Sequence, residues 1–186
     1  AFAKAGVIDA ALGNAWLGRG LCDIRLGRRA AGRDDLLVAA AVEPNRALLR
    51  SYLGKAFGET GDAAHAAAEL ELAQRLDPKD PTAWLYSALL NHQQNRVNES
   101  IRDLEQSQAL NDNRHVYRSR LMLDSDRAVR SANLALLYRD AGLVDLATRE
   151  AAQAVHHDYA NYSAHLFLAD SFKSLRDPQQ VNLRYE

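Results

Sequence analysis

The chain of 186 residues has little of several features that mark specialised classes of protein. Cysteine occurs once, at Cys22, so no intramolecular disulfide or multi-thiolate metal site is expected, and we interpret Cys22 as a buried thiol. No apolar run approaches the roughly 20 residues of a membrane-spanning helix, so no membrane insertion of this segment is expected. Neither charge is in excess, with 23 Lys and Arg against 24 Asp and Glu, which disfavours nucleic acid as a partner.

Signatures of catalysis are also missing. The sequence contains no G-x-S-x-G, no P-loop and no H-E-x-x-H. His156, His157, Asp158 and His165 lie close together, but adjacent histidines on a helix point about 100° apart, and no two of these four share a face at a spacing of four. We therefore predict no catalytic residues, no metal site and no cofactor, and keep a histidine-based metal enzyme only as a third alternative.

What the chain does contain is a repeat with a period of 34 residues, within a composition of 47% hydrophobic and 25% charged residues that can form a core. Three pairs of chain-breaking residues show the period without a gap: Gly20 and Gly54, Gly27 and Gly61, and Pro44 and Pro78. A fixed period of this length indicates a fold built from stacked structural units.

Each period is predicted to hold two helices. Small residues stand at the eighth position of the first helix, where a neighbouring helix must approach closely: Gly20, Gly54 and Ala88. In the second helix, leucines and small residues form an apolar stripe: Leu36, Leu70 and Leu104 with Ala39, Ala66, Ala73, Ser100 and Ser107. Gly27, Gly61 and Asn95 fall between the helices, where a residue that tolerates positive φ permits the turn. The sequence therefore predicts helical hairpins.

The pattern W-x2-L-G-x2-Y followed by A-x3-F and P resembles the tetratricopeptide repeat, whose period is 34. Segment 47–80 is the best copy, with these matches: Leu53, Gly54, Phe57, Gly61, Ala66, Leu70, Ala73 and Pro78. It departs at Arg50, where the family favours Trp. The resemblance implies an all-α solenoid, a right-handed superhelix of antiparallel helix pairs that acts as a scaffold and binds a peptide or partner protein in its concave groove.

The copies give an expected organisation of the whole chain, with an irregular insertion where the phase breaks. The expected segments are the end of a preceding repeat at 1–12, repeats at 13–46, 47–80, 81–114 and 128–161, the insertion at 115–127, and a further first helix with a tail at 162–186.

Neither end shows a polar capping unit, so we expect the chain to be part of a longer protein that covers the apolar faces around Phe2, Phe167 and Phe172. The stretch NDNRHVYRSRLMLDSDRAVRSANLALLYRDAGL also resembles a segment of large bacterial repeat proteins associated with the cell envelope. Nineteen arginines against four lysines fit a GC-rich bacterial genome. The cytoplasm and the periplasmic side of the envelope both stay open as compartments.

The family's groove positions, carried over to this chain, give a lining that is mostly apolar and aromatic. The residues are Leu17, Leu21, Tyr52, Lys55, Leu85, Tyr86, Leu89, His92, Leu136, Arg139 and Phe167. For the leucines the alternative is packing beneath the groove, whereas Tyr52 and Tyr86 are the stronger candidates for partner contact. The Lys and Asn set with which some family members hold chaperone tails is missing here.

Two alternatives to a simple groove remain. The insertion is interpreted as a structural plug at an irregular repeat junction, with a partner-binding elbow formed by Arg118 and Arg120 as its alternative. The second alternative concerns the whole chain, which would serve as a spacer or self-association segment of an envelope protein, with its end repeats stacking on one another.

Overall fold

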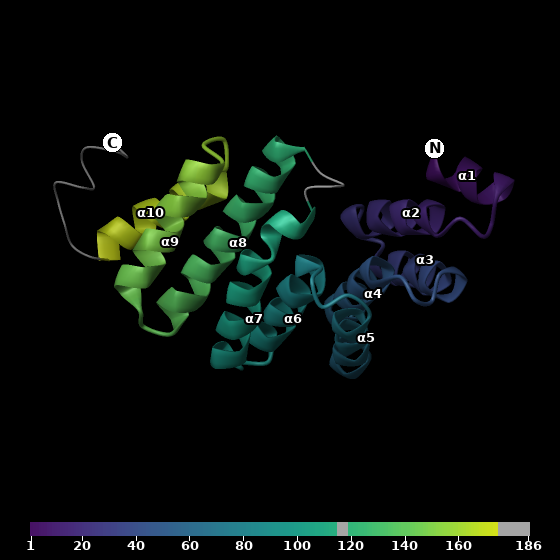
Figure 1. Cartoon of the computed structure of the whole chain (residues 1–186), viewed down its shortest axis with the longest axis horizontal. Coiled ribbons are helices and arrows are strands. Elements are labelled where there is room, and N and C mark those ends of the chain that lie inside the picture. Colours follow the sequence, from purple (N-terminus) through teal and green to yellow (C-terminus); the bar gives the residue numbers. More distant parts are fainter. Residues whose placement is uncertain (115–118, 175–186) are drawn as a thin grey trace. The chain divides into compact units, whose positions relative to one another are not determined.

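The computed structural model describes residues 1–114 and 119–174 (Figure 1). Within these residues the chain is built from helices and contains no strand, which confirms the predicted all-α fold. Two compact units are formed, Ala1–Leu90 and Asn91–Glu186. Among the described helices, none is both long enough and apolar enough to span a membrane.

The helices of the first unit follow the predicted alternation of first and second helices. They are α1 (Phe2–Ile8), α2 (Gly13–Arg25), α3 (Arg29–Val42), α4 (Ala47–Glu59), α5 (Ala63–Leu76) and α6 (Pro81–Gln93), of which the last three residues belong to the second unit. The second unit continues with α7 (Val97–Ala109), the 3₁₀ helix η1 (Asn111–Arg114), α8 (Arg120–Asp140), α9 (Val144–His157) and α10 (Tyr162–Ser174). Figure 1 shows the hairpins α4–α5 and α8–α9, whose helices pack along each other.

The turns inside the hairpins share one backbone conformation. Gly27, Gly61 and Gly142 have φ of 82°, 84° and 79°, and Asn95 has φ of 59°. After each of these residues the next N–H donates to the carbonyl five residues back, as in Arg28 N to Asp23 O at 2.9 Å. This is the Schellman arrangement, which satisfies the last carbonyls of a helix and reverses the chain. The predicted turns at Gly27, Gly61 and Asn95 are confirmed.

Small residues allow the two helices of a hairpin to approach closely. A Cβ on Gly20 would lie 2.8 Å from the carbonyl oxygen of Gly32, and a Cβ on Gly54 would lie 2.6 Å from Cγ of Leu70. Both distances are too short for real side chains, so these positions admit only glycine without rearrangement. The predicted close contact at the eighth position of the first helix is confirmed for these two repeats.

The core of the first unit lies between its hairpins. Its buried members include Leu36, Leu53, Phe57, Leu70 and Leu90, and the half-buried Tyr52 and Tyr86 pack against its edge. The predicted second-helix stripe is confirmed, because its three leucines and five small residues are all at most 2% exposed. Burial of this apolar surface is the main stabilising term of the fold.

The second unit contains the helix on which the 34-residue phase breaks. Helix α8 has 21 residues, whereas α2, α4, α6 and α10 have 13 each. Of the predicted insertion, 115–118 lie outside the described residues, and 120–127 form the first two turns of α8. Ser119 caps this helix through its side chain, which accepts a hydrogen bond from Met122 N at 3.4 Å.

A side-chain hydrogen bond that recurs along the chain holds the start of the first helices in place. The side chain at the fourth position donates a hydrogen bond to the carbonyl oxygen six residues earlier, in the loop before the helix. The bonds run from Trp16 to Ala10 at 2.8 Å, from Arg50 to Pro44 at 3.0 Å, from Trp84 to Pro78 at 3.2 Å and from His165 to Tyr159 at 2.9 Å. Arg50, which departs from the family's Trp, therefore makes the same bond.

Two expectations about single residues are wrong. Cys22 is exposed, because its apolar neighbours Leu21 and Ile24 lie on other faces of α2 and the thiol points outward. Phe172 is only 7% exposed and packs against Leu168 and Ala135, so it does not belong to an uncovered end face. Phe2, by contrast, is 45% exposed and lies over Gly18.

The close approach of α2 and α3 predicts the effect of one methyl group. Gly20→Ala should lower the free energy of unfolding by about 1–3 kcal/mol, since the new Cβ meets the Gly32 carbonyl, which is backbone and cannot move aside cheaply. Gly6→Ala is the matched control, because nothing lies within 4 Å of its Cβ and alanine favours the helix. Urea denaturation measures both, and equal stability of the two variants would contradict the contact.

The hydrogen bond from the fourth residue of the first helix predicts that tryptophan can replace Arg50 better than leucine can. Arg50→Leu and Arg50→Trp both lose the ion pair with Glu69, but only Trp keeps a donor for the Pro44 carbonyl. Arg50→Trp should therefore be more stable than Arg50→Leu by about 1 kcal/mol in thermal denaturation. Identical stabilities would show that this bond contributes nothing to the start of α4.

Candidate functional site

The predicted groove residues lie at the partly exposed surface of the first helices. Arg139 is exposed. The other ten are half-buried, and they are Leu17, Leu21, Tyr52, Lys55, Leu85, Tyr86, Leu89, His92, Leu136 and Phe167. None of these side chains is fully buried, so all retain surface that a partner can contact. Their role in binding stays a prediction.

In the first unit an aromatic pair joins α4 to α6. The ring centroids of Tyr52 and Tyr86 are 5.6 Å apart with an interplanar angle of 57°, a tilted arrangement that aromatic pairs favour. Lys55, one turn after Tyr52 on α4, places its Nζ 5.3 Å from the Tyr86 centroid. We call Tyr52, Lys55 and Tyr86 the α4–α6 cluster.

In the second unit a cation and an aromatic ring join α8 to α10. The Cζ atom of Arg139 lies 4.5 Å from the Phe167 ring centroid. Leu136 is half-buried one turn earlier on α8, and Leu166 on α10 is 48% exposed. We call Leu136, Arg139, Leu166 and Phe167 the α8–α10 cluster. On α6, His92 Nε2 lies 3.0 Å from Oδ2 of Asp140, in an ion-pair geometry.

The predicted elbow is only partly described. Arg118 lies outside the described residues, and Arg120 is exposed at the start of α8. Arg120 lines an open cavity of about 370 Å³ with Asp112, Leu123, Asp124 and Arg127. Because Arg127 already pairs with Asp112 and Asp124 adds a second carboxylate, the cavity offers little net positive charge for an acidic ligand.

The four residues that resembled a metal cluster make other contacts in the structure. The His165 ring donates from Nε2 to the Tyr159 carbonyl, and Asp158 accepts a hydrogen bond from the Ser125 hydroxyl at 3.1 Å. The His156 and His157 rings are 5.8 Å apart and tilted by 59°. Within the described ranges, no three His, Cys, Asp or Glu side chains are grouped so that they could hold a metal ion.

Sequence reasoning missed a buried polar network where α7 meets α8. Arg130 is 3% exposed and donates to the Ser107 hydroxyl at 2.8 Å and to Asn111 Oδ1 at 2.7 Å. The Tyr138 hydroxyl donates to Glu105 at 2.6 Å, and burial followed by this carboxylate raises the pKa of Tyr138 above its usual range. The available signal was serine in place of alanine at two successive small positions of α7, Ser100 and Ser107, because small polar residues there predict a polar neighbour.

An ion pair between a buried carboxylate and a partly exposed guanidinium in the first unit was also missed. Asp35 is 8% exposed on α3 and accepts hydrogen bonds from the Arg19 guanidinium, which also stacks 4.4 Å from the Trp16 ring centroid. The bond to Asp35 raises the pKa of Arg19. The two residues next to Asp35 in the sequence are one charged and one apolar residue, so nothing in the local pattern marks Asp35 as inward-facing.

Comparison with known proteins finds the fold among solved structures, at low sequence identity. No family model and no curated protein matches the sequence. Among solved structures, a chain of the APC/C hetero-tetramer Cut9–Hcn1 has a TM-score of 0.83 at 19% identity, over 97% of this chain and 34% of that one. PilF of Pseudomonas aeruginosa has a TM-score of 0.78 at 18% identity, over 95% of this chain and 74% of that one. A thermophilic TPR protein of Thermus thermophilus has a TM-score of 0.77 at 17% identity, over 92% and 87%.

The environment of His157 predicts a pH dependence of stability. Burial, and then the nearby Arg127 guanidinium, lower the pKa of His157 below its ordinary 6.5. The folded chain therefore favours the neutral ring, so its contribution to stability is complete above pH 6.5 and is lost as the pH falls through the lower folded value. His157→Gln should lose less stability than the unchanged chain between about pH 7.5 and 5. Thermal denaturation measures this, and NMR titration of His157 at or above 6.5 would contradict it.

Proposed function

This chain has the tetratricopeptide-repeat fold, and on that premise we propose that it is a non-catalytic scaffold that binds another polypeptide on the partly exposed faces of its first helices. Proteins of this fold commonly work by protein interaction. One of the similar structures, the Cut9–Hcn1 hetero-tetramer, is itself a complex of proteins. This chain covers 34% of that relative's length, so the activity of the whole relative is not assigned to this chain.

The observation that carries the proposal is the tyrosine pair of the α4–α6 cluster. Tyr52 and Tyr86 stand at the same position of successive first helices and contact each other, yet both remain half-buried. Their inner edges pack on the core, so the rings are held in place before a partner arrives. Rigid, partly exposed aromatic rings with a polar hydroxyl are the side chains that most often dominate protein interfaces.

A second candidate function is self-association through the N-terminal end. The observation that favours it is the exposure of Val7 and Ile8 at the end of α1, which are 88% and 86% exposed. Large apolar side chains with this exposure gain free energy when a second surface covers them. Phe172 is buried and cannot contribute to such an end-to-end contact.

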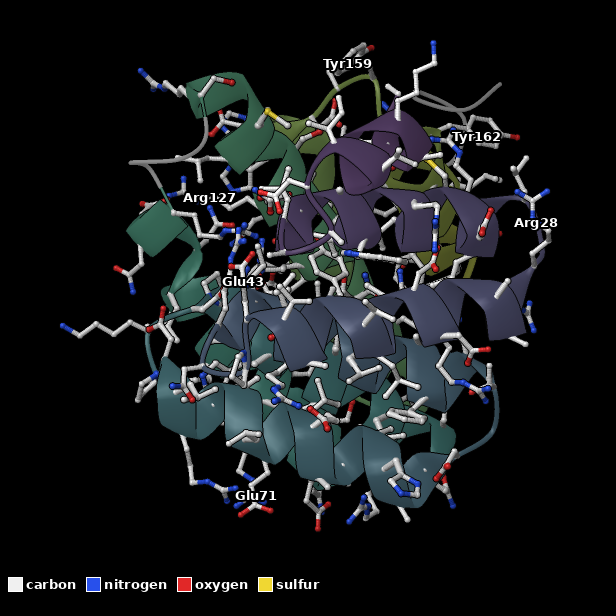
Figure 2. The ribbon with its side chains drawn as sticks, turned by 90° about the vertical axis from the view of Figure 1, so that its right-hand side faces the viewer. Arg28, Glu43, Glu71, Arg127, Tyr159 and Tyr162 are labelled. Atoms are coloured by element: carbon white, nitrogen blue, oxygen red, sulfur yellow. The ribbon has the colours of Figure 1, made fainter. Side chains whose placement is uncertain are left out.

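The two candidates are separated by variants on different surfaces. Tyr52→Ala/Tyr86→Ala should abolish capture of partners from a bacterial lysate, because loss of a tyrosine that is a hot spot of an interface weakens binding about tenfold or more. Arg75→Ala/Glu71→Ala is the control, since both side chains are more than half exposed on α5 and Glu71 points away from the helices (Figure 2). Circular dichroism verifies that all variants are folded.

Capture of the same proteins by the tyrosine variant would contradict the scaffold proposal. Light scattering across a concentration series tests the second candidate, which requires a mass above that of the monomer. If Val7→Ser/Ile8→Ser restores the monomer mass while capture by the unchanged chain stays absent, self-association is the better account.

A further inference from the structure

The same chemical arrangement occurs in both units at the contact between successive first helices. In the first, Lys55 of α4 lies over the ring of Tyr86 on α6, and in the second, Arg139 of α8 lies over the ring of Phe167 on α10. Each time the cation comes from the earlier helix and the aromatic ring from the next one. The cation is lysine in one cluster and arginine in the other, and the ring is tyrosine in one and phenylalanine in the other. The pairing of a cation with a ring therefore recurs although the residue types differ.

Both cations are only loosely engaged by carboxylates. The closest approach of Lys55 Nζ is 3.6 Å, to Glu59 Oε1, and that of Arg139 Nε is 3.9 Å, to Asp140 Oδ1. These distances exceed those of charge-assisted hydrogen bonds, which are about 2.7–2.9 Å. Across the described part of the chain, neither cation has a hydrogen-bonded partner, and their side chains are 32% and 41% exposed.

Two other arginines of the fold are engaged more firmly. Arg50 donates to both carboxylate oxygens of Glu69 at 3.1 and 3.3 Å, and Arg19 is hydrogen-bonded to the buried Asp35. These guanidinium groups hold helices together and have little capacity left for a ligand. Lys55 and Arg139 keep their donors, and the aromatic ring beneath each one shields it from water on one side.

Each cluster also carries partly exposed apolar side chains. Tyr52 contacts the ring of Tyr86 in the first cluster. In the second, the half-buried Leu136 stands one turn before Arg139 on α8, and the exposed Leu166 directly precedes Phe167 on α10. A ligand side chain that packs on this apolar surface brings its neighbours within reach of the cation. A carboxylate at that point gains a charge-assisted bond in a partly desolvated place, where such bonds are strongest.

We propose that the polypeptide bound by this chain is acidic, with aspartate or glutamate next to bulky apolar residues, and that the Lys55–Tyr86 pair of the first unit and the Arg139–Phe167 pair of the second unit are each a contact site for such a polypeptide. The inference rests on the proposed scaffold function and specifies the chemistry of the partner. At each site an apolar side chain packs on the aromatic ring, and the neighbouring carboxylate replaces Glu59 or Asp140 as the closest anion.

The test uses three fluorescein-labelled pools of short peptides and the full chain. One pool combines Asp and Glu with Leu, Ile and Phe, the second combines Lys and Arg with the same apolar residues, and the third combines Asp and Glu with Ser, Thr and Asn. Fluorescence anisotropy in low and high salt should show the tightest binding for the first pool, weakening as salt screens the contacts.

Variants assign the binding to the two pairs. Lys55→Gln and Arg139→Gln should each weaken binding of the acidic apolar pool about fivefold to tenfold, whereas Glu59→Gln should strengthen it by removing the competing carboxylate. Arg75→Gln is the control, because its guanidinium bonds to Glu71 on the outer face of α5. Equal weakening by Arg75→Gln would mean that the effect is non-specific attraction, and would overturn the proposal.

Failure of this inference is distinguishable from failure of the scaffold function. If the basic or the polar pool binds as tightly as the acidic apolar pool and binding still depends on Tyr52 and Tyr86, the scaffold stands and the acidic partner is wrong. If no pool binds in a way that depends on these tyrosines, both proposals are contradicted for these faces.

Discussion

The contact between the two helices of each hairpin is the constraint on which the rest of this structure depends. Gly20 and Gly32 bring α2 and α3 so close that a single methyl group would meet a backbone carbonyl, and Gly54 brings Leu70 of α5 against α4. Packing at this distance places the second helix over one side of the first. The other side of the first helix is left partly exposed, and the side chains there, Tyr52 and Tyr86 among them, become the surface available to a partner.

Where the 34-residue phase breaks, polar contacts replace apolar ones between neighbouring helices. The first unit is held by an apolar core of leucine, alanine and phenylalanine, whereas α7 and α8 of the second unit are joined through Arg130, Ser107 and Asn111. Buried polar groups of this kind stabilise only when their hydrogen bonds are made, and in return they specify one geometry. This network therefore fixes the register of the long helix α8 against η1, at the point where the repeat alone no longer determines it.

The parts of the fold that follow from short-range rules could be predicted from the sequence. Gly27 and Asn95 mark turns because positive φ restricts the residue types allowed there, and Gly54 marks a close contact because any Cβ would clash. Side-chain orientation without periodic support could not be predicted, which is why Cys22 was placed inside and the inward-facing Asp35 was missed. For the candidate site, the groove positions identified which side chains stay partly exposed, but the pairing of Lys55 with Tyr86 and of Arg139 with Phe167 depends on the stacking of separate helices.

The central claim is that a partner polypeptide lies on the half-buried faces of the first helices. Site-specific photo-crosslinking tests it most directly, with a benzophenone side chain placed at Leu89 on α6 in one variant and at Glu71 on the outer face of α5 in another (Figure 2). A partner on these faces should crosslink from position 89 and not from position 71. Crosslinks that form from position 71 alone would contradict the claim.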